Sequence, residues 1–413
     1  MKRKIINDPL YGFVSIDNPL IFEVIGHPWF QRLRHIRQLG MADMVYPGAG
    51  HSRFQHALGA YHLMGKALDS LRNKGVEISA QEREAVLLAI LLHDIGHGPL
   101  SHALEETLMP GVHHESITYR FLISLNKQFD GKLDLALKIF RDGYERRFFH
   151  QLVSGQIDID RLDYLERDSF FTGVREGIIG VDRIIDMLNV HRGQLVVEEK
   201  AVYSLENFIT ARRLMYWQVY LHKTAISAER MMVNLIRRAQ WLARAGHVPP
   251  CTPALRTFLE HSITLEDFGN GRLGMDPLQQ YSLLDDHDIW SALKTWTNHP
   301  DPVLSRLSTM LINRDIFAIT LSDKAIKKSD ILAVRNRVRK AFGLGVRDAA
   351  SMFSHGTVSN EAYVTGEKRI NVLLKNGKVT DLAKLSELPQ IRALTKVVKK
   401  NFLCLPKSIN LEA

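Results

Sequence analysis

The residues best suited to chemistry lie in the segment LLHDIGHGPLSH, residues 91–102, where the adjacent pair His93 and Asp94 is followed by His97 and His102. An imidazole and a carboxylate side by side offer two ligands to a divalent metal ion. The apolar run AVLLAILL before them predicts a buried helix, in which two polar groups without partners would be costly. The segment therefore predicts a metal site.

Further ligands must come from other segments, because neighbouring residues on a helix project about 100° apart. His56 lies near the start of one predicted amphipathic helix, and Asp160 near the start of another. Taken alone, His56 has the ordinary alternative of a core histidine, and Asp160 that of a helix cap or surface acid. With His93 and Asp94 they form a set that suits iron, manganese, zinc or nickel, and magnesium less well.

Other side chains near this set could act on a bound anion. Arg53 precedes His56 by three residues, so both share one face of the predicted helix, although a surface charge is the ordinary alternative for Arg53. His102 can serve as nucleophile or general acid, since imidazole is the side chain best suited to proton transfer near neutral pH. The alternative for His97 and His102 is support of the metal ligands.

Hydrophobic periodicity predicts the elements that position these residues. Turn signals around the run GFVSI predict a hairpin or short extended segment within residues 1–20, and residues 194–199 predict an isolated strand. Apolar positions recurring every three or four residues predict helices over 20–38, 52–74, 80–95, 114–128 and 131–142, and two more within 202–245.

The C-terminal residues follow a different pattern. Asn376 and Gly377 between apolar runs predict a hairpin, and residues 397–405 predict another strand. We therefore expect a mostly α fold, with a helical domain over residues 1–315 and a smaller α+β appendage over residues 316–413.

Composition narrows the class of partner. The 413 residues carry a formal net charge of +9, which favours anionic partners such as nucleotides, polyphosphates or nucleic acid. The densest basic run, residues 324–340, fits an ordinary solvated helix face better than an anion-binding surface. Cys251 and Cys404 imply no disulfide framework, and no apolar run is long enough for a signal peptide or a membrane span. A soluble, cytoplasmic protein with no membrane partner is expected.

The order of the motifs resembles the HD-domain phosphohydrolases, specifically the deoxynucleoside triphosphate triphosphohydrolases of the sterile-alpha-motif/HD type. The resemblance covers roughly residues 8–225, and no sterile-alpha-motif domain is expected before it. It implies a helical HD-domain core and one divalent metal ion per active site, bound by His56, His93, Asp94 and Asp160. The motifs that carry it are DPLYGFVSI, FQRLRHIRQLG, PGAGHSRFQHALG, HDIGHGPLSH, HES at residues 114–116 and DIDRLDYLERD.

The resemblance also implies catalytic roles. His97, His102, His114 and Glu115 fall at the family's catalytic and phosphate-proximal positions. Glu105 stands where the animal member has an aspartate that orients the catalytic histidine, and it is one methylene longer. Whether an additional Mg²⁺ accompanies the nucleotide is left open.

The nucleotide pocket is implied in the same way. The spacing of Asp160, Arg161, Tyr164, Arg167 and Asp168 places a metal ligand, cations and a ring on one broad helical face, although without the family Tyr164 would be read as core packing. In the family pattern Arg161 stands for a phosphate-binding lysine, Tyr164 packs under the deoxyribose and rejects a 2′-hydroxyl, and Asp168 contacts the sugar. Gln38 and Leu39 match sugar-edge positions, and Arg212 and Tyr220 match a phosphate-binding arginine and an aromatic residue. Leu221 replaces a polar residue, which leaves base preference open.

Regulated relatives assemble into tetramers after nucleotides bind allosteric sites. Gln31 and Arg34 stand in matching positions, but Gly26 replaces the aspartate that recognises guanine in the animal protein. The resemblance implies a homodimer or homotetramer and leaves an activating nucleotide open.

The leading hypothesis is a metal-dependent triphosphohydrolase that cleaves a deoxynucleoside triphosphate (dNTP) into deoxynucleoside and inorganic tripolyphosphate by attack at the α-phosphorus. A second hypothesis is a phosphomonoesterase or phosphodiesterase acting on nucleoside monophosphates, cyclic nucleotides or single-stranded nucleic acid. A third is a nucleic-acid-binding or nucleotide-sensing module, for which the intact ligand set would be needless.

Overall fold

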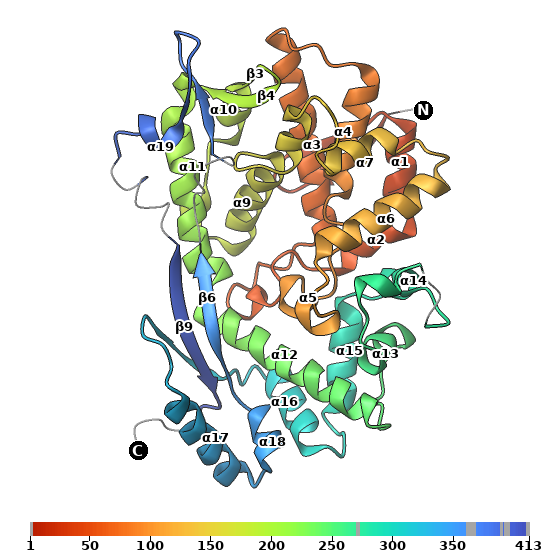
Figure 1. Ribbon diagram of the computed structural model, residues 1–413, viewed down its shortest axis with the longest axis vertical. Coiled ribbons are helices and arrows are strands. Elements are labelled where there is room, and N and C mark those ends of the chain that lie inside the picture. Colours follow the sequence, from red (N-terminus) through yellow and green to blue (C-terminus); the bar gives the residue numbers. More distant parts are fainter. Residues whose placement is uncertain (1–2, 270–272, 361–368, 389–390, 392–396, 410–413) are drawn as a thin grey trace.

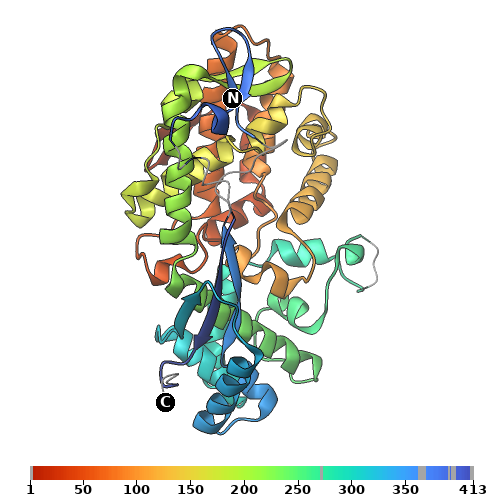
Figure 2. The same ribbon diagram turned by 60° about the vertical axis from the view of Figure 1, so that its left-hand side comes forward.

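The computed structural model describes residues 3–269, 273–360, 369–388, 391 and 397–409. The molecule is elongated, with α3, α4, α9 and α11 in the upper part of Figure 1 and α12 crossing the lower part. The turned view in Figure 2 shows the same division, with the C-terminal strands beside α12. Among the described residues, no helix combines the length and apolar character needed to cross a membrane.

The chain begins with the predicted hairpin, made by β1 (Lys4–Asp8) and β2 (Gly12–Ile16). The single helix predicted over residues 20–38 is wrong, because the segment divides into α1 (Pro19–Gly26), α2 (Pro28–Gln31) and a 3₁₀ turn, η1 (Arg32–His35). The cause is Pro28, which lacks a backbone N–H and holds the preceding His27 in an extended conformation.

The central helices match their predicted positions closely. Ser52 and Ser79 form capping boxes at the starts of α3 (Arg53–Asn73) and α4 (Ala80–Leu92), which pack against each other. However, α4 ends at Leu92, so the His93–Asp94 pair lies in the turn after the helix and not inside it. The helices that follow are α5 (His102–Leu108), α6 (His114–Gln128), α7 (Asp134–Phe140), α8 (Phe148–Val153) and α9 (Ile159–Thr172).

The next segment contains both predicted long helices, α11 (Val202–Met215) and α12 (Lys223–Arg244), joined by a short π-helix, η5 (Tyr216–Tyr220). The isolated strand predicted at residues 194–199 is wrong. This strand, β4 (Gln194–Glu198), pairs antiparallel with β3 (Leu188–His191) and parallel with β7 (Asn371–Leu373). Periodicity identified the strand but could not reveal a partner more than 170 residues away. A short helix, α10 (Val181–Asp186), precedes β3.

The C-terminal residues combine helices with two small sheets. The predicted hairpin is confirmed as β7 and β8 (Val379–Asp381), which complete the sheet β3-β4-β7-β8. The predicted final strand is confirmed as β9 (Val398–Leu405), between β5 (Ala318–Ser322) and β6 (Ser354–Asn360). The remaining helices are α13 (Pro253–Glu260), α14 (Pro277–Ser282), α15 (Asp286–Trp296), α16 (Pro302–Ile312), α17 (Lys328–Phe342), α18 (Val346–Ala350) and α19 (Leu382–Leu385).

Candidate metal centre and active-site cavity

Four side chains from three separated segments lie close together, and we call them the metal group. One ligand atom each from His56, His93 and Asp160 lies within 4.8 Å of the others, and Asp94 lies beside the two imidazoles. Nε2 of His56 on α3 lies 3.3 Å from Nε2 of His93, which follows α4. Oδ1 of Asp160 on α9 lies 3.1 Å from the His56 nitrogen and 3.4 Å from the His93 nitrogen. Asp94 places its carboxylate oxygens 3.4 Å from His93 Nε2 and 3.7 Å from His56 Nε2. These are the four residues that the sequence predicted as metal ligands.

The hydrogen bonds behind the imidazoles show what the metal group can bind. Nδ1 of His93 lies 2.6 Å from the carbonyl oxygen of Ile90, which only accepts, so this nitrogen donates. Nδ1 of His56 lies 2.7 Å from a carboxylate oxygen of Asp163. In the neutral rings both Nε2 lone pairs therefore face each other and the carboxylates. Such a convergence of acceptors is stabilised by a proton or by a metal cation, and its nitrogen and oxygen donors fit a divalent transition metal ion.

Electrostatics favour positive charge at the same point. Burial lowers the pKa of His56, but its interactions with Asp160 and Asp163 outweigh this and raise the pKa to about 10. Burial acts to raise the pKa of Asp94, yet the charges of His93 and Arg53 hold it well below its usual range. Burial also acts to raise the pKa of Asp160, but the charge of His93 and hydrogen bonds with His56 and His93 lower it below its usual range. Both carboxylates of the metal group are therefore ionised and available as ligands.

A buried network supports the metal group from behind. Asp163 also accepts from Nε of Arg167 at 2.9 Å, and Arg167 reaches Asp8 of the N-terminal hairpin at 2.9 Å. Gly59 makes room for this network, because a Cβ atom there would collide with Asp163 and Arg167. The prediction that Arg167 shares a substrate-binding face is wrong: its guanidinium is fully buried in these ion pairs.

The segment between the metal group and α5 is a strained turn. Leu100 and Ser101 both have φ of 56°, a left-handed conformation that is unfavourable for residues other than glycine. Asp286 of α15 accepts from the Leu100 N–H at 2.7 Å. Arg53 holds the Ser101 hydroxyl at 2.9 Å and also pairs with Asp94. These contacts place His102 at the first position of α5.

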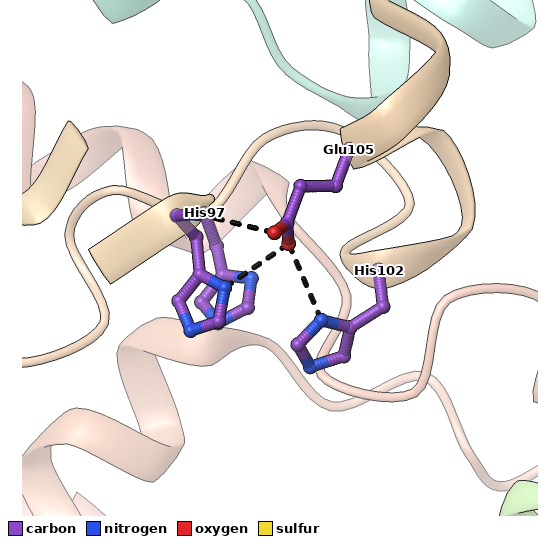
Figure 3. A group of neighbouring side chains, drawn as sticks. His97, His102 and Glu105 are labelled. Atoms are coloured by element: carbon purple, nitrogen blue, oxygen red, sulfur yellow. Dashed lines mark hydrogen bonds and ion pairs between the residues drawn. The ribbon is translucent and has the colours of Figure 1, made fainter. Parts of the chain in front are cut away.

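Beyond the turn, imidazoles gather around one carboxylate. His97 and His114 stack with ring centroids 3.9 Å apart. Oε2 of Glu105 lies 3.0 Å from Nδ1 of His114 and 3.3 Å from Nδ1 of His102. Figure 3 shows the Glu105 carboxylate pointing toward the His102 ring. Burial acts to raise the pKa of Glu105, but His102 and His114 lower it well below its usual range. Burial lowers the pKa of His97 well below its usual range, so the His97 ring stays neutral.

A cavity of about 400 Å³ extends from the metal group along these residues. Tyr220 donates to Asp168 at 2.8 Å, and the other carboxylate oxygen lies 2.8 Å from Nε2 of the buried His51. The cavity wall combines part of the metal group with the predicted catalytic and sugar-binding residues: Gln38, Leu39, Arg53, Asp94, His97, His102, His114, Asp160, Tyr164, Asp168 and Tyr220.

Comparison with known proteins identifies the domains that carry these residues. Residues 53–168 match the HD domain, and residues 179–245 match the HD associated region. An uncharacterised Bacillus subtilis protein, YwfO, is 31% identical over 94% of this chain and 88% of its own length. This chain belongs to the HD-domain phosphohydrolase family. A phosphohydrolase structure from Bacteroides thetaiotaomicron is similar to this HD-domain phosphohydrolase with a TM-score of 0.94, 48% identity, and coverage of 98% of this chain and 100% of the other.

Other relatives carry an activity in their names. A deoxynucleoside triphosphate triphosphohydrolase SAMHD1 homologue of Dictyostelium discoideum is 31% identical over 57% of this chain, and the human SAMHD1 protein is 29% identical over 57%. The matched segment spans only 49% and 44% of those two proteins. Their similarity therefore establishes the shared domain, not the whole activity.

Several predicted residues of this HD-domain phosphohydrolase lie away from the cavity wall. Arg161 pairs with Asp158, the N-cap of α9, because that carboxylate is only one turn away. Arg212 lies beneath the Tyr216 ring, with its guanidinium 5.9 Å from the ring centroid. Neither is among the described residues that line the cavity. Glu115 lines a different cavity of about 440 Å³ on the other side of the metal group, with Tyr119 and Arg141.

The residues proposed for nucleotide regulation bond to one another. Gln31 donates to the carbonyl of Ile25 at 2.7 Å and accepts from Nε of Arg34 at 2.7 Å. The Arg34 guanidinium lies 3.6 Å from the centroid of the Phe54 ring. A role in binding an activating nucleotide stays a prediction.

Sequence reasoning missed the supporting residues His51, Asp163 and Asp286. Asp163 follows the ligand Asp160 by three residues, and this spacing could have suggested that it backs the metal group. His51 and Asp286 carry no such signal, since their partners are 117 and 186 residues away.

Proposed function

We propose that this HD-domain phosphohydrolase cleaves deoxynucleoside triphosphates into deoxynucleoside and inorganic tripolyphosphate. The observation that carries the proposal is the cavity, which joins the metal group and three histidines to a wall of Tyr164, Asp168 and Tyr220. Its volume of about 400 Å³ lies in the range of small-molecule sites, and one nucleotide can extend along it.

His56, His93, Asp94 and Asp160 would hold the divalent ion. When bound, such an ion polarises a phosphoryl oxygen and lowers the pKa of a coordinated water molecule. Arg53, held by Asp94 and Ser101, adds a fixed positive charge for the phosphates. His102 donates the proton that the leaving 5′-oxygen needs, and Glu105 orients its ring through Nδ1. His97 and His114 add two more polar side chains to the cavity wall beside the phosphates.

Away from the histidines, the cavity is lined by Tyr164 and Tyr220, whose ring centroids lie 6.2 Å apart. The Tyr220 hydroxyl donates a hydrogen bond to Asp168. Tyr164 packs against the sugar and leaves no room for a 2′-hydroxyl, so deoxyribonucleotides are preferred. The names of the SAMHD1 relatives support this substrate class.

The test is a product analysis. Metal-supplemented protein is incubated with each of the four dNTPs and with ATP, singly and in pairs, and the products are separated by anion exchange. We expect deoxynucleoside and tripolyphosphate in equal amounts from at least one dNTP, and faster turnover in a pair would reveal an activating nucleotide. In parallel incubations with nucleoside monophosphates and a single-stranded oligonucleotide, release of orthophosphate or shortened oligonucleotides, without tripolyphosphate from any dNTP, would instead indicate a phosphomonoesterase or phosphodiesterase. Salt-sensitive oligonucleotide binding by Asp94→Ala, without turnover by the parent, would indicate a binding module.

A further inference from the structure

A second group of potential ligands lies next to the metal group and shares no residue with it. His97, His102, Glu105 and His114 place one ligand atom each within 4.8 Å of one another. The His102 side chain is 69% exposed and that of Glu105 is 12% exposed. The cluster is therefore buried at Glu105 and open to solvent at His102. An ion from solution can reach it without passing the metal group.

The geometry around Glu105 suits a small ion. The backbone N–H of His114 donates to Oε1 at 3.2 Å, and this bond fixes the orientation of the carboxylate. Oε2 then lies 3.3 Å from Nδ1 of His102 and 3.0 Å from Nδ1 of His114. Ligand atoms in a tetrahedral zinc site, with bonds of roughly 2.0–2.1 Å, lie roughly 3.3 Å apart. The two distances from Oε2 already have about this value, and one ligand atom from each of the four residues lies within 4.8 Å of the others.

The donor types select the class of ion. Two imidazole nitrogens and one carboxylate suit zinc, cobalt or nickel, whereas magnesium and calcium prefer shells of oxygen. A further nitrogen, Nδ1 of His97, is buried and has no hydrogen-bond partner among the residues that the structure describes. Three protein ligands beside a cavity also leave a tetrahedral position for water.

We propose that His102, Glu105 and His114 bind a second, dissociable transition-metal ion of the zinc class, separate from the metal group. Occupancy would take up Nδ1 of His102 and break its contact with Glu105. Because the proposed function uses His102 for proton transfer, an ion at this second site inhibits the reaction. The inhibition rests on the proposed function, but the binding does not.

The test uses Co²⁺ as a spectroscopic probe of the 413-residue chain. The parent should bind two equivalents, the weaker one with the strong visible absorption of tetrahedral cobalt. Glu105→Gln should bind one equivalent and lose that absorption. Glu106→Gln is the matched control, because Glu106 is the adjacent residue of α5 and its side chain is 59% exposed. It should behave like the parent.

A second variant, His102→Ala, removes a mostly exposed ring and should lose the same equivalent, with circular dichroism showing that both variants fold. If Glu105→Gln or His102→Ala folds and binds as much cobalt as the parent, the second site does not exist. Excess Zn²⁺ should lower dNTP turnover by the parent and by Glu106→Gln roughly 100-fold, the scale of general acid catalysis. Unchanged parent turnover at saturating zinc would overturn the inhibition. Absence of any turnover would refute the proposed function and leave the cobalt result intact.

Discussion

Each imidazole of the metal group is fixed by a hydrogen bond on the far side of its ring. Asp163 holds His56 and the Ile90 carbonyl holds His93, so both Nε2 atoms face the ion site. Such supporting partners set the tautomer and the basicity of a metal-bound histidine. Metal binding at this site therefore depends on Asp163 and the Ile90 carbonyl as well as on the four residues of the metal group.

Replacing Asp163 with asparagine should weaken metal binding by about 10- to 100-fold, because His56 loses its charged partner. Competition with a fluorescent chelator measures the change. Asp186→Asn, at an exposed position, is the control and should bind as the parent does. Equal metal affinity in Asp163→Asn and Asp186→Asn would show that Asp163 does not support metal binding.

Metal affinity should rise with pH. His56 has a pKa raised to about 10 without an ion, so below that pH the ion must displace a proton. Release of one proton gives an affinity gain of about tenfold per pH unit, ending near pH 10. Calorimetry in buffers of different ionisation enthalpy counts the protons released. A pH-independent affinity with no proton release would contradict the proposed protonation of His56.

Tyr164 should control the choice between deoxyribose and ribose. Tyr164→Ala opens space beside the sugar, so the ratio of kcat/KM for dATP over ATP should fall by about 10-fold or more. Tyr164→Phe keeps the ring and should retain the preference. The same loss in both variants would point to the hydroxyl and not to packing.

Among the elements, the strained turn before α5 is the one most directly tied to chemistry. Two consecutive residues with left-handed φ persist there because Asp286 and Arg53 bond to them. Sequence periodicity did not predict α5 and located the end of α4 only approximately, because it carries no information about the Asp286 side chain of α15 that holds the turn. Helix ends are fixed by such contacts, and Leu92 ends α4 three residues before the predicted boundary.

Asp286→Ala should release this turn and lower kcat by about 100-fold, as expected when a catalytic group moves by about 1 Å. Metal content should stay unchanged, because Asp286 bonds to Leu100 and Arg37 and not to the metal group. Asp286→Asn keeps one acceptor and should lose less. Loss of metal together with activity would show that the effect is general unfolding.

Across the whole molecule, the sequence predicted the hairpin and the main helices, because periodicity carries those signals locally, and residue types together with the family resemblance predicted which four residues form the metal group. It could not predict that β7 would pair with β4, or that Arg167 would turn toward Asp8, since both contacts join distant segments. The boundary between residues 315 and 316 stays a prediction. The C-terminal residues nevertheless contact the helical part extensively: Asn234 of α12 donates to the carbonyls of Ser351 and Phe353 at 2.9 and 3.0 Å.

A truncated chain ending at residue 315 should therefore be less stable than the full chain. Its β4 would have a free edge, and α12 would lose the cover of β5 and β6. Thermal unfolding and light scattering measure the outcome, and we expect a lower Tm and a tendency to aggregate. A truncated protein with the Tm of the full chain would show that the boundary separates independent domains.

The central claim is attack at the α-phosphorus beside the metal group. Turnover of a dNTP in H₂¹⁸O, followed by mass spectrometry of both products, tests it most directly. The account predicts one ¹⁸O atom in the tripolyphosphate and none in the deoxynucleoside. Label in orthophosphate or pyrophosphate, or in the deoxynucleoside, would contradict it.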